Sequence, residues 1–187
     1  MVGEPVLRTE QLILRKWRPD DLDPFAAMSA DPEVMRYFPA RQDRAETEAH
    51  IRMITDHLER QPFGWWAVEV PGLFDFAGFA GLLRPRFHAH FTPCVEVGWR
   101  LRRDAWGKGY ATEAGQACLD FAFERMGIDQ VVSMAVVDNR RSRRVMERLG
   151  MTRRPEDDFG HPRLPFDHPL RRHVLYRLSR SAWSKDR

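Results

Sequence analysis

The sequence Trp106-Gly107-Lys108-Gly109-Tyr110-Ala111-Thr112-Glu113-Ala114 decides how the rest of the chain is interpreted. It lies between a predicted strand that ends at Leu101 and an amphipathic helix. Glycine has no side chain, so backbone N–H groups beside Gly107 and Gly109 can approach a ligand closely. The first N–H groups of a helix have no partner inside it, and the helix dipole adds positive charge there. The stretch is therefore either a phosphate or pyrophosphate site or an ordinary glycine-rich turn.

The chain downstream of this stretch alternates between helix and strand patterns. A helix follows Gly109, with apolar residues at helical spacing, and Gly127 is expected at its C-terminal cap. The β-branched segment 130–137 predicts a buried strand, a short helix ends at Gly150, and residues 173–178 form a terminal strand. A strand–helix–strand unit therefore occupies the second half of the chain.

The chain upstream begins with one strand and two helices and continues with strands. Asp43 and Glu46 form a capping-box pattern, and Pro71-Gly72 is a turn signal that predicts a β-hairpin. The elements expected here are a strand over 12–17, a helix from Pro19, a helix after Asp43, hairpin strands over 65–70 and 74–83, and a strand over 95–101. The full order β-α-α-β-β-β-α-β-α-β-β predicts a mixed α/β (α+β) domain.

The length and composition are those of one folded domain. The chain has 187 residues, of which 43% are hydrophobic and 30% are charged, a balance that excludes a disordered protein. No apolar run approaches the ~20 residues that span a bilayer, and residues 1–10 do not resemble a signal peptide. Cys94 and Cys118 form neither a disulfide framework nor a metal-ligand spacing. We therefore expect a cytoplasmic protein with no metal and no membrane partner.

The charge of the chain raises the question of its ligand. The chain has 30 Lys and Arg residues and 27 Asp and Glu residues, which gives a net charge of +3 and a pI of about 9.2. Taken alone, this basic pI suggests a protein that binds nucleic acid. Three of the cationic residues are lysine and 27 are arginine. A preference of the genome for arginine explains this excess as well as binding of an anionic ligand does. Arginines precede the glycine-rich stretch and recur within 140–148. Their positions favour a local anion site over a nucleic-acid surface, so no nucleic-acid partner is expected.

Four segments together resemble one family of enzymes. Gly109 and Ala111 fill the two small positions of motif A of the GNAT superfamily of N-acetyltransferases, whose pattern is Gln/Arg-x-x-Gly-x-Gly/Ala. Trp106 stands where Gln or Arg is usual, as in the subgroup similar to the ribosomal-protein acetyltransferases RimJ and RimL. The other three segments resemble the opening strand, the strand before motif A and the Asn-x-x-Ser helix of that subgroup, and they are 12–15, 96–99 and 139–151.

The resemblance implies both a fold and an activity. It covers 7–183, which is expected to be a single GNAT-like domain with short tails at 1–6 and 184–187. The implied fold is a mixed, mostly antiparallel twisted sheet flanked by helices. The implied reaction is direct attack of a primary amine, either a protein N-terminus or a small molecule, on acetyl-coenzyme A. A non-catalytic acyl-CoA-binding or regulatory domain is the alternative, and the oligomeric state stays open between a monomer and a homodimer.

The same resemblance assigns residues to the coenzyme. The backbone of the glycine-rich stretch would bind the pyrophosphate, the strand before it would pair with the pantetheine arm, and the Asn-x-x-Ser helix would lie near the thioester. Nearby arginines suit the phosphates. The coenzyme-binding candidates are Trp99, Leu101, Arg102, Arg103, Trp106, Gly107, Lys108, Gly109, Tyr110, Ala111, Thr112, Asn139, Ser142 and Arg144.

The reaction requires a general base, a donor to the developing oxyanion and stabilisation of the thiolate. Glu96 is one candidate base, and Asp158 with His161 is the other. Glu96 fits equally as a structural carboxylate, and His161 as a solvated loop residue. Ser142 would donate to the leaving thiolate, or it binds backbone at the start of a helix. Tyr176, on the last strand, is expected to have a core or wall role.

The segment 153–172 holds four prolines and no clear periodicity. A loop of this length in a compact domain is usually functional, so we expect it to line the acceptor pocket. Its acidic residues would attract a cationic amine, and aromatic residues elsewhere in the chain would complete the wall. The acids are Glu156, Asp157 and Asp158, and the aromatic residues are Tyr37, Phe38, Trp65 and Trp66.

Overall fold

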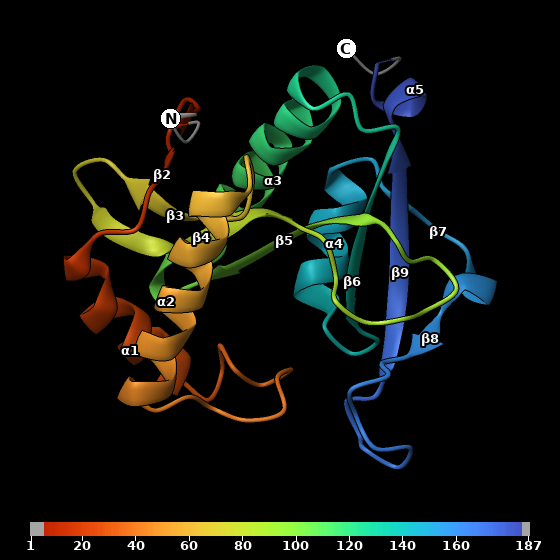
Figure 1. Cartoon of the computed structure of the whole chain (residues 1–187), viewed down its shortest axis with the longest axis horizontal. Coiled ribbons are helices and arrows are strands. Elements are labelled where there is room, and N and C mark those ends of the chain that lie inside the picture. Colours follow the sequence, from red (N-terminus) through yellow and green to blue (C-terminus); the bar gives the residue numbers. More distant parts are fainter. Residues whose placement is uncertain (1–5, 185–187) are drawn as a thin grey trace. The chain divides into compact units, whose positions relative to one another are not determined.

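The computed structural model describes residues 6–184, so the predicted tails, 1–6 and 184–187, lie almost entirely outside the described residues. Its strands are β1 (Leu7–Arg8), β2 (Ile13–Arg15), β3 (Trp65–Val70), β4 (Phe74–Leu83), β5 (Val95–Leu101), β6 (Gln130–Val136), β7 (Thr152–Arg153), β8 (Phe159–Gly160) and β9 (Arg172–Ser179) (Figure 1). Its α-helices are α1 (Leu22–Ala30), α2 (Arg44–Arg60), α3 (Tyr110–Asp120), α4 (Arg140–Arg148) and α5 (Arg180–Trp183). Short helical turns are η1 (Pro19–Asp21), η2 (Arg103–Ala105), the π-turn η3 (Phe121–Arg125) and η4 (Pro155–Asp157).

The residues group into two compact units that interleave along the chain. The first unit contains residues up to 81 together with 99–117, and the second contains 82–98 together with residues from 118 onward. The boundaries fall inside β4, β5 and α3, so each of these three elements contributes residues to both units.

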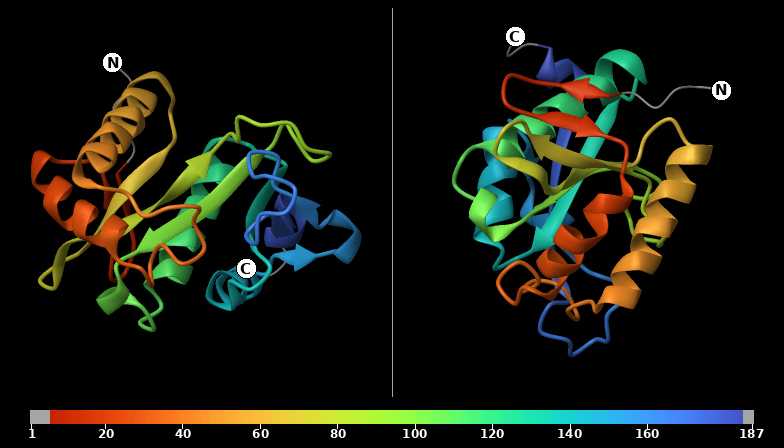
Figure 2. Two further views of the ribbon diagram at one scale, coloured as in Figure 1. Left: turned by 90° about the horizontal axis from the view of Figure 1, so that it is seen from below. Right: turned by 90° about the vertical axis from the view of Figure 1, so that its left-hand side faces the viewer.

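The first unit is built on consecutive antiparallel strands. β1 pairs with β2, β2 with β3, and β3 with β4, with Trp66 opposite Ala80. Figure 2 shows α1 and α2 together on one face of these strands and α3 on the other. Phe25 of α1 and Phe79 of β4 belong to the core on the α1–α2 face, and Trp17 and Ile51 pack against it. The aromatic residues of the hairpin thus anchor both helices.

Gly78 allows β4 and β5 to approach closely within the first unit. Its φ is +137°, and a Cβ built on it would lie 2.2 Å from the carbonyl oxygen of Arg100. The N–H of Arg102 donates to the carbonyl of Ala77 nearby, at 2.9 Å. A side chain at position 78 would therefore collide with backbone that cannot move aside.

Replacing Gly78 by alanine should lower the free energy of unfolding by about 2–4 kcal/mol, because backbone strain and overlap with a neighbouring strand act together. Gly72 is a matched control, since it has a φ of +76° but open space around its Cβ position. Gly72→Ala should cost only about 1–2 kcal/mol of left-handed strain. Urea denaturation followed by circular dichroism measures both, and equal losses would contradict the close contact.

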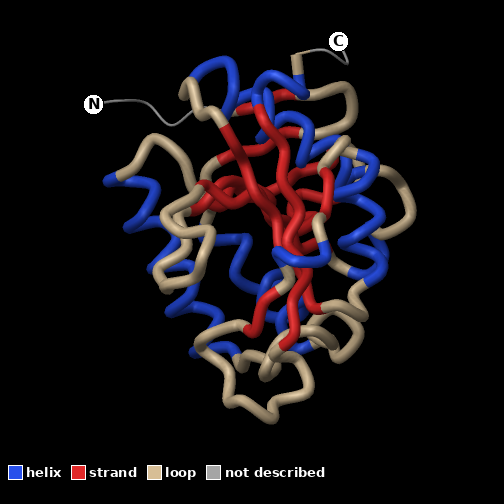
Figure 3. The backbone as a smooth tube through the Cα atoms, turned by 90° about the vertical axis from the view of Figure 1, so that its right-hand side faces the viewer, coloured by secondary structure: helices blue, strands red, loops and turns tan. Residues whose placement is uncertain are grey.

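The second unit is built around the long antiparallel pair of β6 and β9. Their register runs from Gln130 opposite Ser179 to Val136 opposite His173. β7 and β8 also pair with β9, and the amino-terminal part of β5 runs parallel to β6. Between β8 and β9, residues 161–171 form neither helix nor strand and are drawn as loop (Figure 3).

The predicted fold class is confirmed: the sheet is mixed, mostly antiparallel and flanked by helices. The hairpin and the strand before the glycine-rich stretch have the predicted bounds. Three strands, β7, β8 and β9, follow α4 where two were predicted, and β1 and α5 have no predicted counterpart, because elements of two to four residues are too short to show a period. The segment 153–172, predicted as irregular, contains β8 and all of η4. Among the helices of residues 6–184, none has the length and apolar character needed to cross a membrane.

Candidate active site

The glycine-rich stretch forms an exposed turn that leads into α3. Gly107 and Gly109 have φ values of +76° and +87°, and a Cβ built on either would meet no atom within 4 Å. Within the described chain, the N–H groups from Gly107 to Ala111 donate no hydrogen bond, whereas those of Thr112 and Glu113 donate to the Gly109 carbonyl. The turn therefore presents unpaired N–H donors at a helix N-terminus, an arrangement suited to phosphate.

Side chains in and beside the turn divide into anchors and exposed cations. The ring of Trp106 packs against the core of the first unit, and its Nε1 donates to the Leu101 carbonyl at 2.9 Å. Tyr110 is buried as well. Lys108 and Arg103 are exposed beside the turn. Trp106 and Tyr110 thus fix the position of the turn, while the two cations face solvent where an anionic ligand would bind.

Arg102 is held by its own neighbours. Its Nε donates to Asp104 at 2.6 Å, and its guanidinium lies 5.0 Å from the ring centroid of Phe74. These contacts fix the side chain against β4, so Arg102 is less available to a phosphate than Arg103.

The edge of β5 that faces β6 is open for most of its length. The parallel ladder consists of Val95 opposite Val131 and Glu96 opposite Val132, and it ends there. From Val97 onward, no described strand pairs with this edge of β5. A strand that accepts an extended ligand must present an unpaired row of N–H and C=O groups, and β5 meets this requirement.

The Asn-x-x-Ser segment forms the start of α4. Asn139 is the N-cap, and its Oδ1 accepts a hydrogen bond from the N–H of Ser142 at 3.2 Å. The Ser142 hydroxyl is partly buried and makes no hydrogen bond to any described residue, so it does not cap the helix. Arg143 donates to the Val137 carbonyl, and Arg144 is exposed and its side chain forms no hydrogen bond or ion pair with residues 6–184.

A family model described as an acetyltransferase (GNAT) domain matches residues 11–152. The chain belongs to the GNAT acetyltransferase family. It is similar to the uncharacterized N-acetyltransferase p20 of Bacillus licheniformis, with 30% identity over 76% of this chain and 80% of that protein. It is 27% identical to the FsC-acetyl coenzyme A-N(2)-transacetylase of Aspergillus fumigatus over 97% of this chain and 79% of that protein.

A solved structure agrees with the GNAT assignment at the level of the fold. The structure of a putative ribosomal-protein-serine acetyltransferase from Vibrio cholerae has a TM-score of 0.77 and 17% identity, covering 96% of this chain and 99% of that one. At this identity the likeness concerns the fold alone.

Glu96 is the carboxylate with the most unusual environment in this GNAT chain. It lies at the last paired position of β5, it is partly buried, and no described residue donates a hydrogen bond to it or forms an ion pair with it. Burial raises its pKa from 4.5 to about 7. A carboxyl group with this pKa exchanges protons near neutral pH, as a general base must.

Asp158 and His161, the rival candidates, are both engaged. Arg153 forms a bidentate ion pair with the Asp158 carboxylate. The Nδ1 of His161 accepts the N–H of Arg163 at 3.3 Å, which leaves the proton of the neutral ring on Nε2. Burial is the main cause that lowers the pKa of His161 to about 4, and electrostatic interactions with His173, Arg163 and Arg171 lower it further. His161 thus has no lone pair free to accept a proton in this arrangement.

Other residues named from the sequence have structural contacts. The Tyr176 hydroxyl donates to Glu147 at 2.8 Å, and the side chain is buried, as expected for a core role. Asp157 pairs with Arg177, so the acids of the 153–172 segment are largely neutralised. The expectation that Trp66 lines an acceptor pocket is wrong, because its side chain is fully buried in the core.

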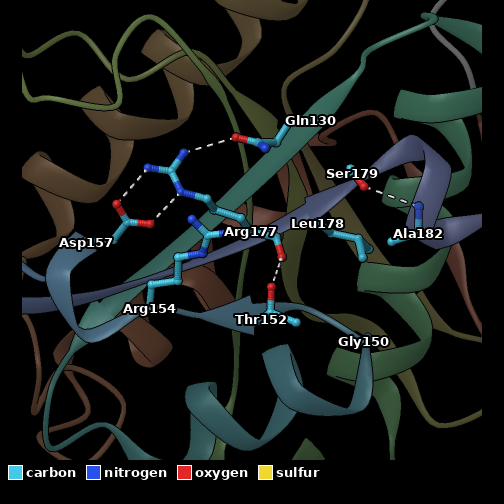
Figure 4. A pocket seen from close by; sticks show the side chains of 9 residues that line it. All are labelled: Gln130, Gly150, Thr152, Arg154, Asp157, Arg177, Leu178, Ser179 and Ala182. Carbon is cyan, nitrogen blue, oxygen red and sulfur yellow. Dashed lines mark hydrogen bonds and ion pairs between the residues drawn. The ribbon is translucent and has the colours of Figure 1, made fainter.

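A surface pocket of the second unit lies at the β7–β9 edge, and Asp157 is the one residue lining it that was predicted to belong to the acceptor pocket. Figure 4 shows Arg154 and Arg177 among the residues that line it, with Arg177 held by Asp157 and Gln130. The remaining lining residues are Gly150, Thr152, Leu178, Ser179 and Ala182. Among the described residues, no group of three or more His, Cys, Asp or Glu side chains is placed to hold a metal ion.

Proposed function

We propose that the chain transfers the acetyl group of acetyl-coenzyme A to a primary amine by direct attack. The observation that carries this proposal is the open edge of β5, which begins immediately after Glu96. An amide-bearing pantetheine arm would pair with that edge as an added strand. The free N–H groups of the turn after β5 would bind the pyrophosphate.

Coenzyme binding in this proposal relies mainly on backbone. Trp99 and Leu101 would pair with the pantetheine through main-chain groups, and the turn from Gly107 to Thr112 would hold the pyrophosphate. Arg103, Lys108 and Arg144 are exposed cations available to the phosphates. Acetyl-coenzyme A supplies an activated thioester, so the protein must position the amine and manage its protons.

Glu96 would act as the general base. The substrate ammonium loses a proton to the carboxylate, directly or through water, and the neutral amine attacks the thioester carbon. A C–N bond forms, the C–S bond breaks, and the thiolate leaves with the electron pair. Ser142, whose hydroxyl is unengaged, would donate a hydrogen bond to the thiolate. A backbone N–H near Gly98 or Trp99 would stabilise the developing oxyanion.

The acceptor class is proposed as a protein N-terminus or a small-molecule amine. The Trp106-Gly-x-Gly segment and the Asn-x-x-Ser helix support a RimJ/RimL-like member. The relative from Aspergillus fumigatus carries acetyl coenzyme A in its name, which supports the same donor for this chain. We also propose, from the sequence, that the protein is cytoplasmic and that it is either a monomer or a homodimer.

Release of free coenzyme A thiol, measured with a panel of amines and peptides, tests the proposal. We expect amine-dependent thiol release with saturable kinetics in acetyl-coenzyme A. Tight binding of acetyl-coenzyme A without release by any amine would instead indicate the non-catalytic acyl-CoA-binding alternative. Absence of coenzyme binding would reject both.

A further inference from the structure

The pocket at the β7–β9 edge has the size and the lining of a site for a small polar ligand. Its volume is about 430 Å³, within the range of cavities that bind small molecules. All nine lining residues belong to the second unit, and six of them carry polar or charged side chains (Figure 4). Such a wall favours a charged ligand over an apolar one.

Arg177 of β9 is a fixed cation on one wall of this pocket. Its Nε and Nη2 donate to the two oxygens of Asp157 at 2.8 and 3.3 Å, and its Nη1 donates to the Gln130 side chain at 3.0 Å. These contacts use three of the five N–H groups of the guanidinium, and the side chain stays 25% exposed. A guanidinium that is already oriented loses little freedom when its two remaining N–H groups bind a ligand.

Arg154, between β7 and η4, is a second cation in the lining and is not engaged. The residue is exposed, and its guanidinium forms no hydrogen bond or ion pair with the described part of the chain. Its neighbour Arg153, by contrast, is paired with Asp158. All five N–H groups of Arg154 are therefore available to a ligand.

The charge of the lining is positive. Asp157 is the one acid among the lining residues, and its carboxylate binds Arg177, while the Nε2 of His90 lies 3.4 Å from Oδ1. The hydrogen bond from Arg177 lowers the pKa of Asp157, so the carboxylate is ionised near neutral pH. Asp157 and Arg177 thus compensate each other, and the charge of Arg154 is left without an acid in the lining to balance it.

Neutral donors stand among the same lining residues. Gln130 accepts from Arg177 through Oε1, and its amide nitrogen donates to no described residue. Thr152 and Ser179 each contribute a hydroxyl group, while Leu178 and Ala182 form a small apolar part of the wall (Figure 4). Hydroxyl and amide donors beside arginines are the groups that surround the oxygens of a bound carboxylate or phosphate.

The pocket shares no residue with the candidates for coenzyme binding. Within the second unit, the coenzyme candidates Asn139 and Ser142 lie at the start of α4, whereas Gly150, which lines the pocket, follows the end of that helix. At the helical rise of 1.5 Å per residue, Ser142 and Gly150 are about 12 Å apart along the helix axis. A ligand in the pocket would therefore lie beyond the far end of α4 from the proposed thioester site.

We infer that this pocket binds a small oxyanion, a carboxylate or phosphate group, at a site separate from that of the coenzyme. Arg154 and the two remaining N–H groups of Arg177 would contact its oxygens, because planar guanidinium donors match pairs of oxygens. The inference stands on the pocket and does not depend on the proposed transferase activity.

The test is a titration of the ¹⁵N-labelled protein with sodium phosphate and, separately, with sodium succinate at constant ionic strength, followed by NMR of the arginine Nε–H groups. We expect the signals of Arg154 and Arg177 to shift saturably with at least one anion, and the tighter of the two identifies the ligand as phosphate or carboxylate. Arg154→Gln should weaken this binding by at least about tenfold, the effect of a charged hydrogen bond. Arg172→Gln is the matched control and should bind as the native protein does, since Arg172 is exposed on the same strand but lies outside the pocket.

Three results would overturn the inference: no saturable shift with either anion, unchanged affinity in Arg154→Gln, or an equal loss in Arg172→Gln. A thermal melt verifies that both variants are folded, as expected for exposed side chains. The titration is then repeated with saturating coenzyme A. Unchanged affinity would support a separate site, whereas displacement of the anion by coenzyme A would show that the pocket belongs to the coenzyme site.

Discussion

Replacing Glu96 by glutamine should lower kcat/KM for the amine by roughly 10²- to 10⁴-fold, the usual contribution of a general base. Affinity for acetyl-coenzyme A should not change, since glutamine keeps the shape of the side chain. The carboxylate accepts a proton only when ionised, and its pKa is about 7. The rate of the native protein should therefore rise as pH increases through about 7, and Glu96→Gln should lose this step. An acceptor with a much higher amine pKa keeps the two titrations apart.

The comparison variants are Asp158→Asn and His161→Gln, which remove the rival bases. Both should retain the rise in rate near pH 7, because Asp158 is paired with Arg153 and His161 Nδ1 is occupied. If either variant, rather than Glu96→Gln, loses the rise, Glu96 is not the base.

Stability provides a readout of Glu96 that is independent of turnover. The folded pKa of about 7 lies above the ordinary value of 4.5, so the folded protein binds more protons than the unfolded chain between these values. The free energy of unfolding of the native protein should decrease as pH rises through this range. Glu96→Gln should flatten that decrease, whereas an unchanged pH dependence would mean that the carboxyl group is not desolvated.

Replacing Gly109 by valine should weaken acetyl-coenzyme A binding by at least about 100-fold. Valine strongly disfavours the φ of +87°, and its side chain would occupy the open side of the turn. Both effects prevent a phosphate group from reaching the free N–H groups of the turn. Isothermal titration calorimetry measures the affinity directly.

Gly72→Val is the matched control for this change. Gly72 has a φ of +76° and equally open surroundings, but it lies in the hairpin turn between β3 and β4. It should lose comparable stability and keep its coenzyme affinity. Unchanged affinity in Gly109→Val, or an equal loss in Gly72→Val, would remove the turn from the binding site.

Local signals explain why much of the fold is predictable from sequence. The capping box of α2 forms as expected, with Asp43 and Glu46 bonded reciprocally. The Pro71-Gly72 turn joins strands with the predicted bounds, and Asn139 caps α4. Each signal involves residues within a few positions of one another, so the local sequence alone is sufficient to predict these turns and helix ends.

The parts that sequence reasoning missed depend on residues distant in the chain. Arg15 is satisfied by Glu69, 54 positions away. The position at which the β5–β6 ladder ends depends on both strands together, so the sequence of neither strand predicts it. The ion pair that engages Asp158 and the contacts that hold Arg177 likewise appear only when the side chains are placed. Glu96 was named from resemblance, but its elevated pKa follows from burial.

The most direct test of the central claim is the stoichiometry of transfer. The protein is incubated with acetyl-coenzyme A and an amine that supports thiol release, and mass spectrometry quantifies acetylated amine against free coenzyme A. We expect one acetylated amine for each coenzyme A released, with formation of both products slowed by at least about 100-fold in Glu96→Gln. Thiol release without acetylated amine would show hydrolysis instead of transfer and would contradict the account.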